Sequence, residues 1–184
     1  AALARVTQSA IDAVKAKSTA PVFVIFSAHG LPKKIVDRGD PYVAQVSATV
    51  HAVVDRLRLA EHQWVTAFQS RVGPLEWVGP PTDHTIEEAA SAGKAIVVVP
   101  VAFVSEHSET LVELDIEYRH LAERRHAAGY ERAPTVSEHP EFIAGLARLV
   151  RQARAGSQRV QPGSGTAPCA DWPRCACRQE PQNE

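Results

Sequence analysis

The chain has 184 residues, 45% of them hydrophobic and 22% charged, which is enough apolar material for one domain with a sizeable core. Its 20 Lys and Arg residues nearly balance its 21 Asp and Glu residues, and the formal net charge of -1 argues against a nucleic-acid partner. Residues 95–104 form the longest strongly apolar stretch, but they include Pro100 and fall far short of the roughly 20 residues that span a bilayer. We therefore expect a soluble, cytoplasmic chain that can still touch a membrane surface at its periphery.

The sequence begins Ala-Ala-Leu-Ala-Arg and contains no methionine. Because translation starts at Met, we expect either a processed product or a segment of a longer protein, and we take the chain to be a segment. A secretory signal is not indicated, since residues 1–17 lack an unbroken apolar core.

Helical and strand-like segments alternate along the chain. Apolar residues recur at helical spacing over residues 1–17, 41–60, 82–92 and 106–128 and from Pro140 onward. Runs of β-branched and aromatic residues, typical of buried parallel strands, occupy residues 22–26, 64–68 and 95–101, with a shorter strand over 130–136. This alternation predicts a three-layer α/β fold of Rossmann type, in which a parallel four-stranded sheet is flanked by helices on both faces.

Individual residues mark the ends of the predicted helices. Asp40 is placed to cap the second helix, with Pro41 in its first turn, and Ser105 is placed to cap the fourth. Gly93 follows the third helix as its C-cap. The apolar face of the last helix is Ile143, Leu146, Ala147 and Val150.

After the last helix the composition changes to Gly, Ser and Pro, which indicates a flexible linker. We therefore divide the chain into an α/β unit over residues 1–154 and a flexible tail over residues 155–184. The cysteines of the chain are Cys169, Cys175 and Cys177, all in this tail. Their spacing fits no zinc finger. Clustered thiolates can hold an iron–sulfur cluster if a fourth ligand comes from elsewhere, and free thiols are the alternative.

Polar residues follow the predicted strands at residues 27–29, 69–73 and 100–107. In open parallel sheets ligands bind beyond the carboxyl ends of the strands, so we expect these segments to meet at one ligand-binding rim. His29 stands there in a turn with Gly30, where an imidazole can act as a base or as a metal ligand. An ordinary loop histidine is the alternative interpretation.

The predicted helix after Ser105 carries an acidic face. Its glutamates fall within about 80° of one another, and His120 lies in the same arc. These glutamates are Glu106, Glu109, Glu113 and Glu117. The opposite, core-facing stripe is Leu111, Leu114, Tyr118 and Leu121. A solvated outer face accounts for such a pattern, but the helix starts at the predicted rim, and an oxygen-rich stripe also suits a ferrous or other divalent ion in transit, or proton relay.

Long motifs surround the predicted strand ends. They are Phe26-Ser-Ala-His-Gly-Leu-Pro32, Arg38-Gly-Asp-Pro-Tyr42, Gln69-Ser-Arg-Val-Gly-Pro74 with Trp77 and Gly79-Pro80, and Pro100-Val-Ala-Phe-Val-Ser-Glu-His-Ser-Glu-Thr-Leu111 with Glu113-Leu-Asp115. In this order they resemble the motifs of the ferrochelatase family, over residues 22–150. The resemblance corresponds to the carboxyl-terminal half of that enzyme. It implies a chelatase-like fold of two similar α/β halves, with a porphyrin in the cleft between them.

Ferrochelatases insert ferrous iron into a porphyrin at the end of haem synthesis. The resemblance implies that His29 is the catalytic histidine and Glu109 its catalytic partner across the cleft, the two together binding the iron. Further metal ligands implied along the same helix are Glu113, His107 and Glu106. The implied porphyrin contacts are Trp77 and Ser27.

The resemblance also bears on cofactors and partners. Some ferrochelatases hold a 2Fe-2S cluster with ligands on a carboxyl-terminal extension and one more in the other half of the chain. Cys169, Cys175 and Cys177 are expected to be such ligands, with the fourth outside this chain. The implied substrates are ferrous iron and protoporphyrin IX, and the implied partner is the missing amino-terminal half. The alternatives are a coproporphyrin ferrochelatase, a half-size chelatase that dimerises, and a non-catalytic haem- or metal-binding module.

Overall fold

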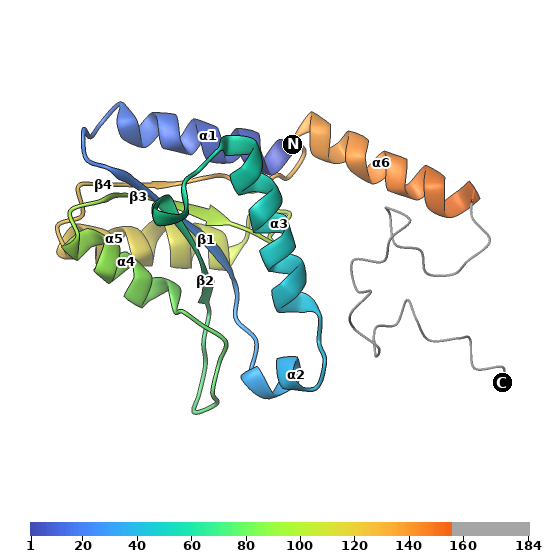
Figure 1. The fold of residues 1–184 in the computed structure, drawn as a ribbon, viewed down its shortest axis with the longest axis horizontal. Helices are drawn as coiled ribbons and strands as arrows, with labels where there is room; N and C mark the ends of the chain where they lie inside the picture. Colours follow the sequence, from blue (N-terminus) through green and yellow to red (C-terminus); the bar gives the residue numbers. More distant parts are fainter. Residues whose placement is uncertain (156–184) are drawn as a thin grey trace.

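The computed structural model describes residues 1–155. Its 4-stranded sheet has the order β2-β1-β3-β4, and every strand pair is parallel. The strands are β1 (Val22–His29), β2 (Trp64–Gln69), β3 (Ala95–Pro100) and β4 (Gly129–Arg132). Helices cover both faces of this sheet (Figure 1), which confirms the predicted three-layer α/β fold. The last strand ends at Arg132, earlier than the sequence pattern predicts.

The helices divide between the two faces. One face carries α1 (Ala2–Lys15) and α3 (Tyr42–Leu57). The other carries α4 (Thr82–Ser91), η2 (Glu109–Glu117) and α5 (Tyr118–Arg124). Shorter helices, α2 (Lys33–Asp37) and η1 (Glu61–Gln63), lie in the connections on either side of α3, and α6 (Pro140–Ala155) follows β4. None of these helices has both the length and the apolar character needed to cross a membrane.

Successive side chains of the central strands point to opposite faces of the sheet and form two separate hydrophobic cores. In β1, Val24 and Phe26 pack toward α1 and α3, whereas Ile25 packs toward α4 and η2. In β3, Val97 and Val98 divide between the two faces in the same way, and the whole strand is buried. Because both faces of these strands are covered, their sequences are continuous apolar runs.

The strand order reverses beside β1. The chain passes from β1 to β2 on one side, and from β2 it crosses back over β1 to β3 on the other side. Ligands of doubly wound sheets bind at such a switch point, outside the carboxyl ends of the strands. His29 ends β1 and Pro100 ends β3, so the fold places His29 and the loop after Pro100 at this position.

The predicted helix caps are partly confirmed. The Asp40 Oδ1 atom accepts a hydrogen bond of 2.9 Å from the Tyr42 backbone N–H at the start of α3. Gly93 follows α4 with a φ of +67°, the left-handed conformation that glycine adopts without steric cost. The expected cap at Ser105 is wrong, because the next helix begins only after Ser108.

The predicted α-helix over residues 106–128 is wrong in type and in length. Residues 109–117 form a π-helix, η2, and only Tyr118–Arg124 continue as α-helix. Leu114 is buried as predicted, but Leu111 of the same expected stripe is 45% exposed. A π-helix has hydrogen bonds from residue i to i+5, so each turn holds more residues and the side chains fan out differently from an α-helix.

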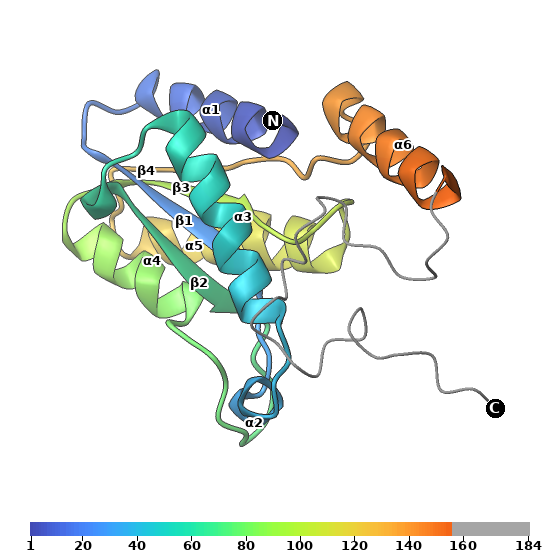
Figure 2. The same cartoon turned by 45° about the vertical axis from the view of Figure 1, so that its right-hand side comes forward.

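The apolar face of α6 is exposed in this chain. Ile143, Leu146 and Val150 are 49%, 43% and 59% exposed, and no residue of α6 is buried. In Figure 2 the helix extends away from the sheet, beside the amino-terminal end of α1. The Arg5 Nε atom and the Glu141 Oε1 atom, 2.8 Å apart, join the two helices there.

Candidate metal and proton-transfer site

His29 and Glu109 meet at the switch point of the sheet. The His29 Nε2 atom lies 3.5 Å from the Glu109 Oε1 atom, and the two side chains are 42% and 37% exposed. β1 positions the imidazole and the first residue of η2 positions the carboxylate. The structure therefore brings this predicted pair together at a place that solvent and a ligand can reach.

One ring nitrogen of His29 is already engaged. Its Nδ1 atom lies 2.8 Å from the backbone carbonyl oxygen of Gly30. A carbonyl oxygen only accepts hydrogen bonds, so Nδ1 carries a proton and donates it. In the neutral ring this leaves the lone pair on Nε2, the nitrogen that faces Glu109. This lone pair can accept a proton or bind a metal ion.

The turn behind His29 is tightly packed. The Gly30 backbone N–H donates a 2.9 Å hydrogen bond to the carbonyl oxygen of Gln69, the last residue of β2. A Cβ atom on Gly30 would lie 3.0 Å from that oxygen and 3.2 Å from the Cε3 atom of Trp77. Trp77, a predicted porphyrin contact, therefore packs against the backbone of the turn. Its contact with a porphyrin stays a prediction.

Glu113 is held at the end of β2. Its carboxylate accepts hydrogen bonds from the Ser70 N–H at 2.9 Å, the Ser70 hydroxyl at 2.6 Å, the Gln69 amide at 3.0 Å and the Tyr118 hydroxyl at 2.9 Å. Ser70 adopts a φ of 60°, uncommon for a residue other than glycine, and directs both of its donors to this carboxylate. Burial, and then the charge of Glu113, raise the pKa of the Tyr118 phenol, so this hydroxyl remains a donor at neutral pH. Glu113 therefore fastens η2 to the sheet.

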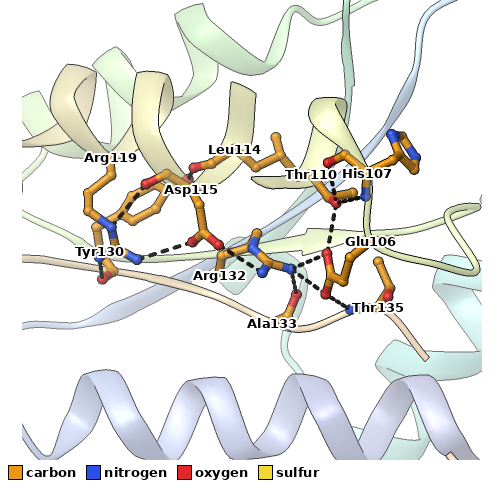
Figure 3. A network of polar contacts seen from close by, with 10 residues as sticks. All are labelled: Glu106, His107, Thr110, Leu114, Asp115, Arg119, Tyr130, Arg132, Ala133 and Thr135. Atoms are coloured by element: carbon orange, nitrogen blue, oxygen red, sulfur yellow. Dashed lines mark hydrogen bonds and ion pairs between the residues drawn. The ribbon is translucent and has the colours of Figure 1, made fainter. Parts of the chain in front are cut away.

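Glu106 turns away from the pair of His29 and Glu109. Its carboxylate accepts hydrogen bonds from Arg132 Nη1 at 3.0 Å and from the Thr135 N–H at 2.9 Å (Figure 3). Burial alone would raise the pKa of Glu106, but the hydrogen bonds from Thr135, Thr110 and Arg132 outweigh it and hold this pKa below its ordinary value. Glu106 is thus a partner of β4 and is not part of one continuous acidic face.

His107 lies between these groups. Its Nδ1 atom accepts a 3.2 Å hydrogen bond from the Glu109 N–H, and its ring lies 5.2 Å from the ring of Phe103, centroid to centroid. Within residues 1–155, no group of three or more His, Cys, Asp or Glu side chains is placed to hold one metal ion. The predicted ligand set therefore divides into the pair of His29 and Glu109 and separate surroundings for His107, Glu106 and Glu113.

Tyr42 is a neighbour of the site that the sequence analysis named within a motif but did not assign to the site. It starts α3 and is half-buried beside the His29 backbone and Glu109. Burial raises the pKa of its phenol, a backbone hydrogen bond with His29 opposes this, and the charge of Glu109 adds to it. The Asp40 cap was the available signal, since it fixes where α3 begins and hence where Tyr42 lies.

Ser27, the other predicted porphyrin contact, lies within β1. It is fully buried, and its hydroxyl lies 2.8 Å from the Gln69 Oε1 atom and 2.8 Å from the Thr82 hydroxyl. Its contact with a porphyrin stays a prediction. Ser27 joins the ends of β1 and β2 to the start of α4. Cys169, Cys175 and Cys177 lie outside the described residues.

An open parallel sheet with an accessible imidazole and carboxylate at its switch point defines an α/β protein equipped for proton transfer or metal contact. The family model for ferrochelatase matches residues 1–154. The chain belongs to the ferrochelatase family.

Curated relatives agree with this assignment. The chain is similar to a ferrochelatase of Caulobacter vibrioides, 47% identical over 170 residues that cover 90% of this chain and 48% of the relative. A ferrochelatase of Pelagibacter ubique is 42% identical over 156 residues, covering 84% of this chain and 45% of the relative. A ferrochelatase of Rickettsia bellii is 45% identical over 158 residues, covering 84% and 44%. The chain thus spans about half the length of the curated relatives it matches.

Proposed function

We propose that this chain supplies the His29 half of a ferrochelatase, and that the complete enzyme inserts ferrous iron into protoporphyrin IX to form protohaem. The contact of 3.5 Å between His29 Nε2 and Glu109 Oε1 at the sheet's switch point carries the proposal. Family membership and relatives named ferrochelatase at 42–47% identity support it.

Porphyrin metallation sets clear chemical demands on the site. Two pyrrole N–H protons must leave while a hydrated cation sheds its water. His29 Nε2 takes up a pyrrole proton, because Nδ1 is committed to the Gly30 carbonyl. The imidazolium that forms is then stabilised by the Glu109 carboxylate. The same nitrogen and carboxylate can instead hold the ferrous ion, so the two roles of His29 remain alternatives. Both side chains are partly exposed, so the first proton can pass on to water before His29 accepts the second.

The partner that we propose is the amino-terminal half of the same enzyme. An apolar groove of about 540 Å³ lies between α1, α6 and the loop after β3. Its apolar lining includes Leu3, Phe103, Val104, Val136, Phe142 and Leu146. A continuous apolar surface of this kind is typical of an interface. The relatives, of which this chain covers less than half, support a second half as its occupant.

Two further proposals concern the cysteine-containing tail and the cellular location of the protein. Cys169, Cys175 and Cys177 would bind a 2Fe-2S cluster together with a ligand from the other half. The clustering of all the cysteines of the chain in this segment supports the proposal. Comparing the visible absorption of the complemented protein with that of its Cys175→Ser variant would test it. We also propose a cytoplasmic location with peripheral membrane contact, for which the exposed Val72 and Leu75 on the loop after β2 offer an apolar contact surface.

The main test is ferrous insertion followed by loss of porphyrin fluorescence without oxygen. The chain would be assayed alone and mixed with the amino-terminal half of the Caulobacter vibrioides relative, with protoporphyrin and with coproporphyrin as substrates. We expect activity only in the mixture, and a loss of about 10²- to 10⁴-fold in His29→Ala, the usual contribution of a general base. His84→Ala removes an exposed histidine of α4 and should leave the rate unchanged.

Each other outcome would assign a different function to this chain. Faster turnover of coproporphyrin would reassign the substrate, and activity of the chain alone as a dimer would indicate a half-size chelatase. Porphyrin binding without insertion by a folded pair, unchanged in His29→Ala, would reject the enzymatic proposal in favour of a haem- or metal-binding module.

A further inference from the structure

We propose that Arg132 is a positioning residue, which holds η2 in its π-helical form and thereby keeps Glu109 opposite His29. Arg132 ends β4, on the far side of β3 from the strand that carries His29. The consequence for catalysis rests on the proposed function, whereas the geometric statement concerns this chain alone.

Arg132 binds the segment that carries Glu109 at two places (Figure 3). Its Nη1 atom donates to both Glu106 carboxylate oxygens, at 3.0 and 3.1 Å, and its Nη2 atom lies 2.8 Å from the Asp115 Oδ2 atom. Glu106 precedes η2 and Asp115 lies within it. Glu109 lies between these two residues in the sequence, so a single guanidinium fixes the backbone on both sides of it.

The first turn of η2 is tied to the same cluster. The Glu106 carboxylate accepts a 2.7 Å hydrogen bond from the hydroxyl of Thr110, the fully buried neighbour of Glu109. The Thr110 hydroxyl in turn accepts a hydrogen bond of 3.0 Å from the His107 N–H. A change in the position of Glu106 is therefore passed directly to the residues on each side of Glu109.

A π-helix of this length needs such support. π-helices mostly occur as single turns inside α-helices, often at functional sites, whereas η2 extends over 9 residues. The opposite flank of η2 is fastened by Glu113 to Ser70 at the end of β2. If Arg132 is lost, Glu113 still holds η2 to the sheet. We therefore expect Glu109 to be displaced while the domain stays folded.

The charges of the cluster are balanced and partly shielded from water. The Arg132 side chain is 9% exposed, and Arg119 lies 3.3 Å from the other Asp115 oxygen, so two guanidinium groups face two carboxylates. The planar guanidinium can bind both carboxylates at once, whereas a lysine ammonium is a single point charge. Lysine at this position should therefore restore only part of the effect.

The test uses NMR signals of the His29 imidazole and amide hydrogen exchange in this chain. Arg132→Met should shift the His29 signals as Glu109→Gln does, and speed exchange in residues 109–117 about tenfold while β1 and β3 keep wild-type protection. Arg132→Lys should give intermediate values. Arg125→Met, which removes an exposed ion pair with Glu87, should change neither measurement. Unchanged His29 signals in a folded Arg132→Met variant would overturn the proposal.

Two further measurements test the role of Arg132 in other ways. If Arg132→Met loses the protection of β3, Glu106→Gln and Asp115→Asn each weaken one ion pair, and both must shift the His29 signals for the proposal to stand. In the complemented enzyme, Arg132→Met should lower kcat about tenfold with little change in the porphyrin KM, because it misplaces a group and removes no porphyrin contact. An inactive wild-type pair would reject the proposed function, and the NMR result would still decide the role of Arg132.

Discussion

The turn that presents His29 leaves no room for a side chain at Gly30. A Cβ atom there would lie 3.0 Å from the Gln69 carbonyl oxygen and 3.2 Å from a ring carbon of Trp77. The Gln69 oxygen is backbone and already accepts the Gly30 N–H at 2.9 Å, so it cannot withdraw without weakening that bond. Gly30→Ala therefore forces the turn, and His29 with it, away from the end of β2.

The size of the effect follows from these contacts. Relieving the overlap requires a displacement of about 0.5 Å, and overpacking of this kind costs about 1–3 kcal/mol. For a domain of about 150 residues each kcal/mol lowers Tm by about 2–4 °C, which gives a fall of about 2–12 °C. Because His29 moves with the turn, we also expect iron insertion by the complemented enzyme to fall by about tenfold or more.

Thermal unfolding of the chain and the insertion assay measure the two effects separately. Gly145→Ala is the matched control, since it adds the same methyl group inside α6, where the nearest atom is the Arg148 Nη2 at 3.8 Å. That substitution should stabilise the chain by about 0.5–1 kcal/mol, because glycine is unfavourable within a helix. A Gly30→Ala variant with wild-type Tm and insertion rate would refute the reasoning.

Two further predictions concern a carboxylate and an interface. Folding lowers the pKa of Glu106 from its ordinary value of 4.5, so its contribution to the free energy of unfolding is complete above pH 4.5 and is lost as the pH falls through the folded-state pKa. Glu106→Gln should therefore destabilise the chain more at pH 7 than at pH 3 in urea unfolding, and an equal difference at both values would contradict this. Leu146→Glu adds a charge to the apolar groove and should weaken binding of the amino-terminal half at least about tenfold in calorimetry, whereas Ala144→Glu, outside the groove lining, should not. Equal binding by both variants would place the interface elsewhere.

The fold could be predicted from sequence because its signals are local. A buried parallel strand such as Ala95–Pro100 is a continuous apolar run, and the Asp40 cap fixes the start of α3. The site was predictable where it depends on the same local signals, since His29 directly follows the apolar part of β1. Glu109 came from the resemblance to a known family, because periodicity alone did not distinguish it from the neighbouring glutamates.

The π-helix could not be predicted, because the interactions that support it are distant in sequence. Leu114 and Tyr118 have a spacing that suits an α-helix equally well. What supports the wider winding is the hydroxyl of Tyr130, which donates 2.6 Å to the Leu114 carbonyl, and the contact of Arg132 with Asp115. Both come from β4, a strand that the chain reaches only after η2 is complete.

The winding of η2 gives three of its nearby glutamates a different strand to face. Glu106 meets Arg132 at the end of β4, Glu113 meets Ser70 at the end of β2, and Glu109 meets His29 at the end of β1. Hydrogen bonds from the protein occupy the first two carboxylates, and each holds one flank of the segment. The third is the carboxylate that lies at the switch point beside a titratable, solvent-accessible ring. We infer that the outer two are fixed so that Glu109 can exchange its partner, whether this is a proton or ferrous iron.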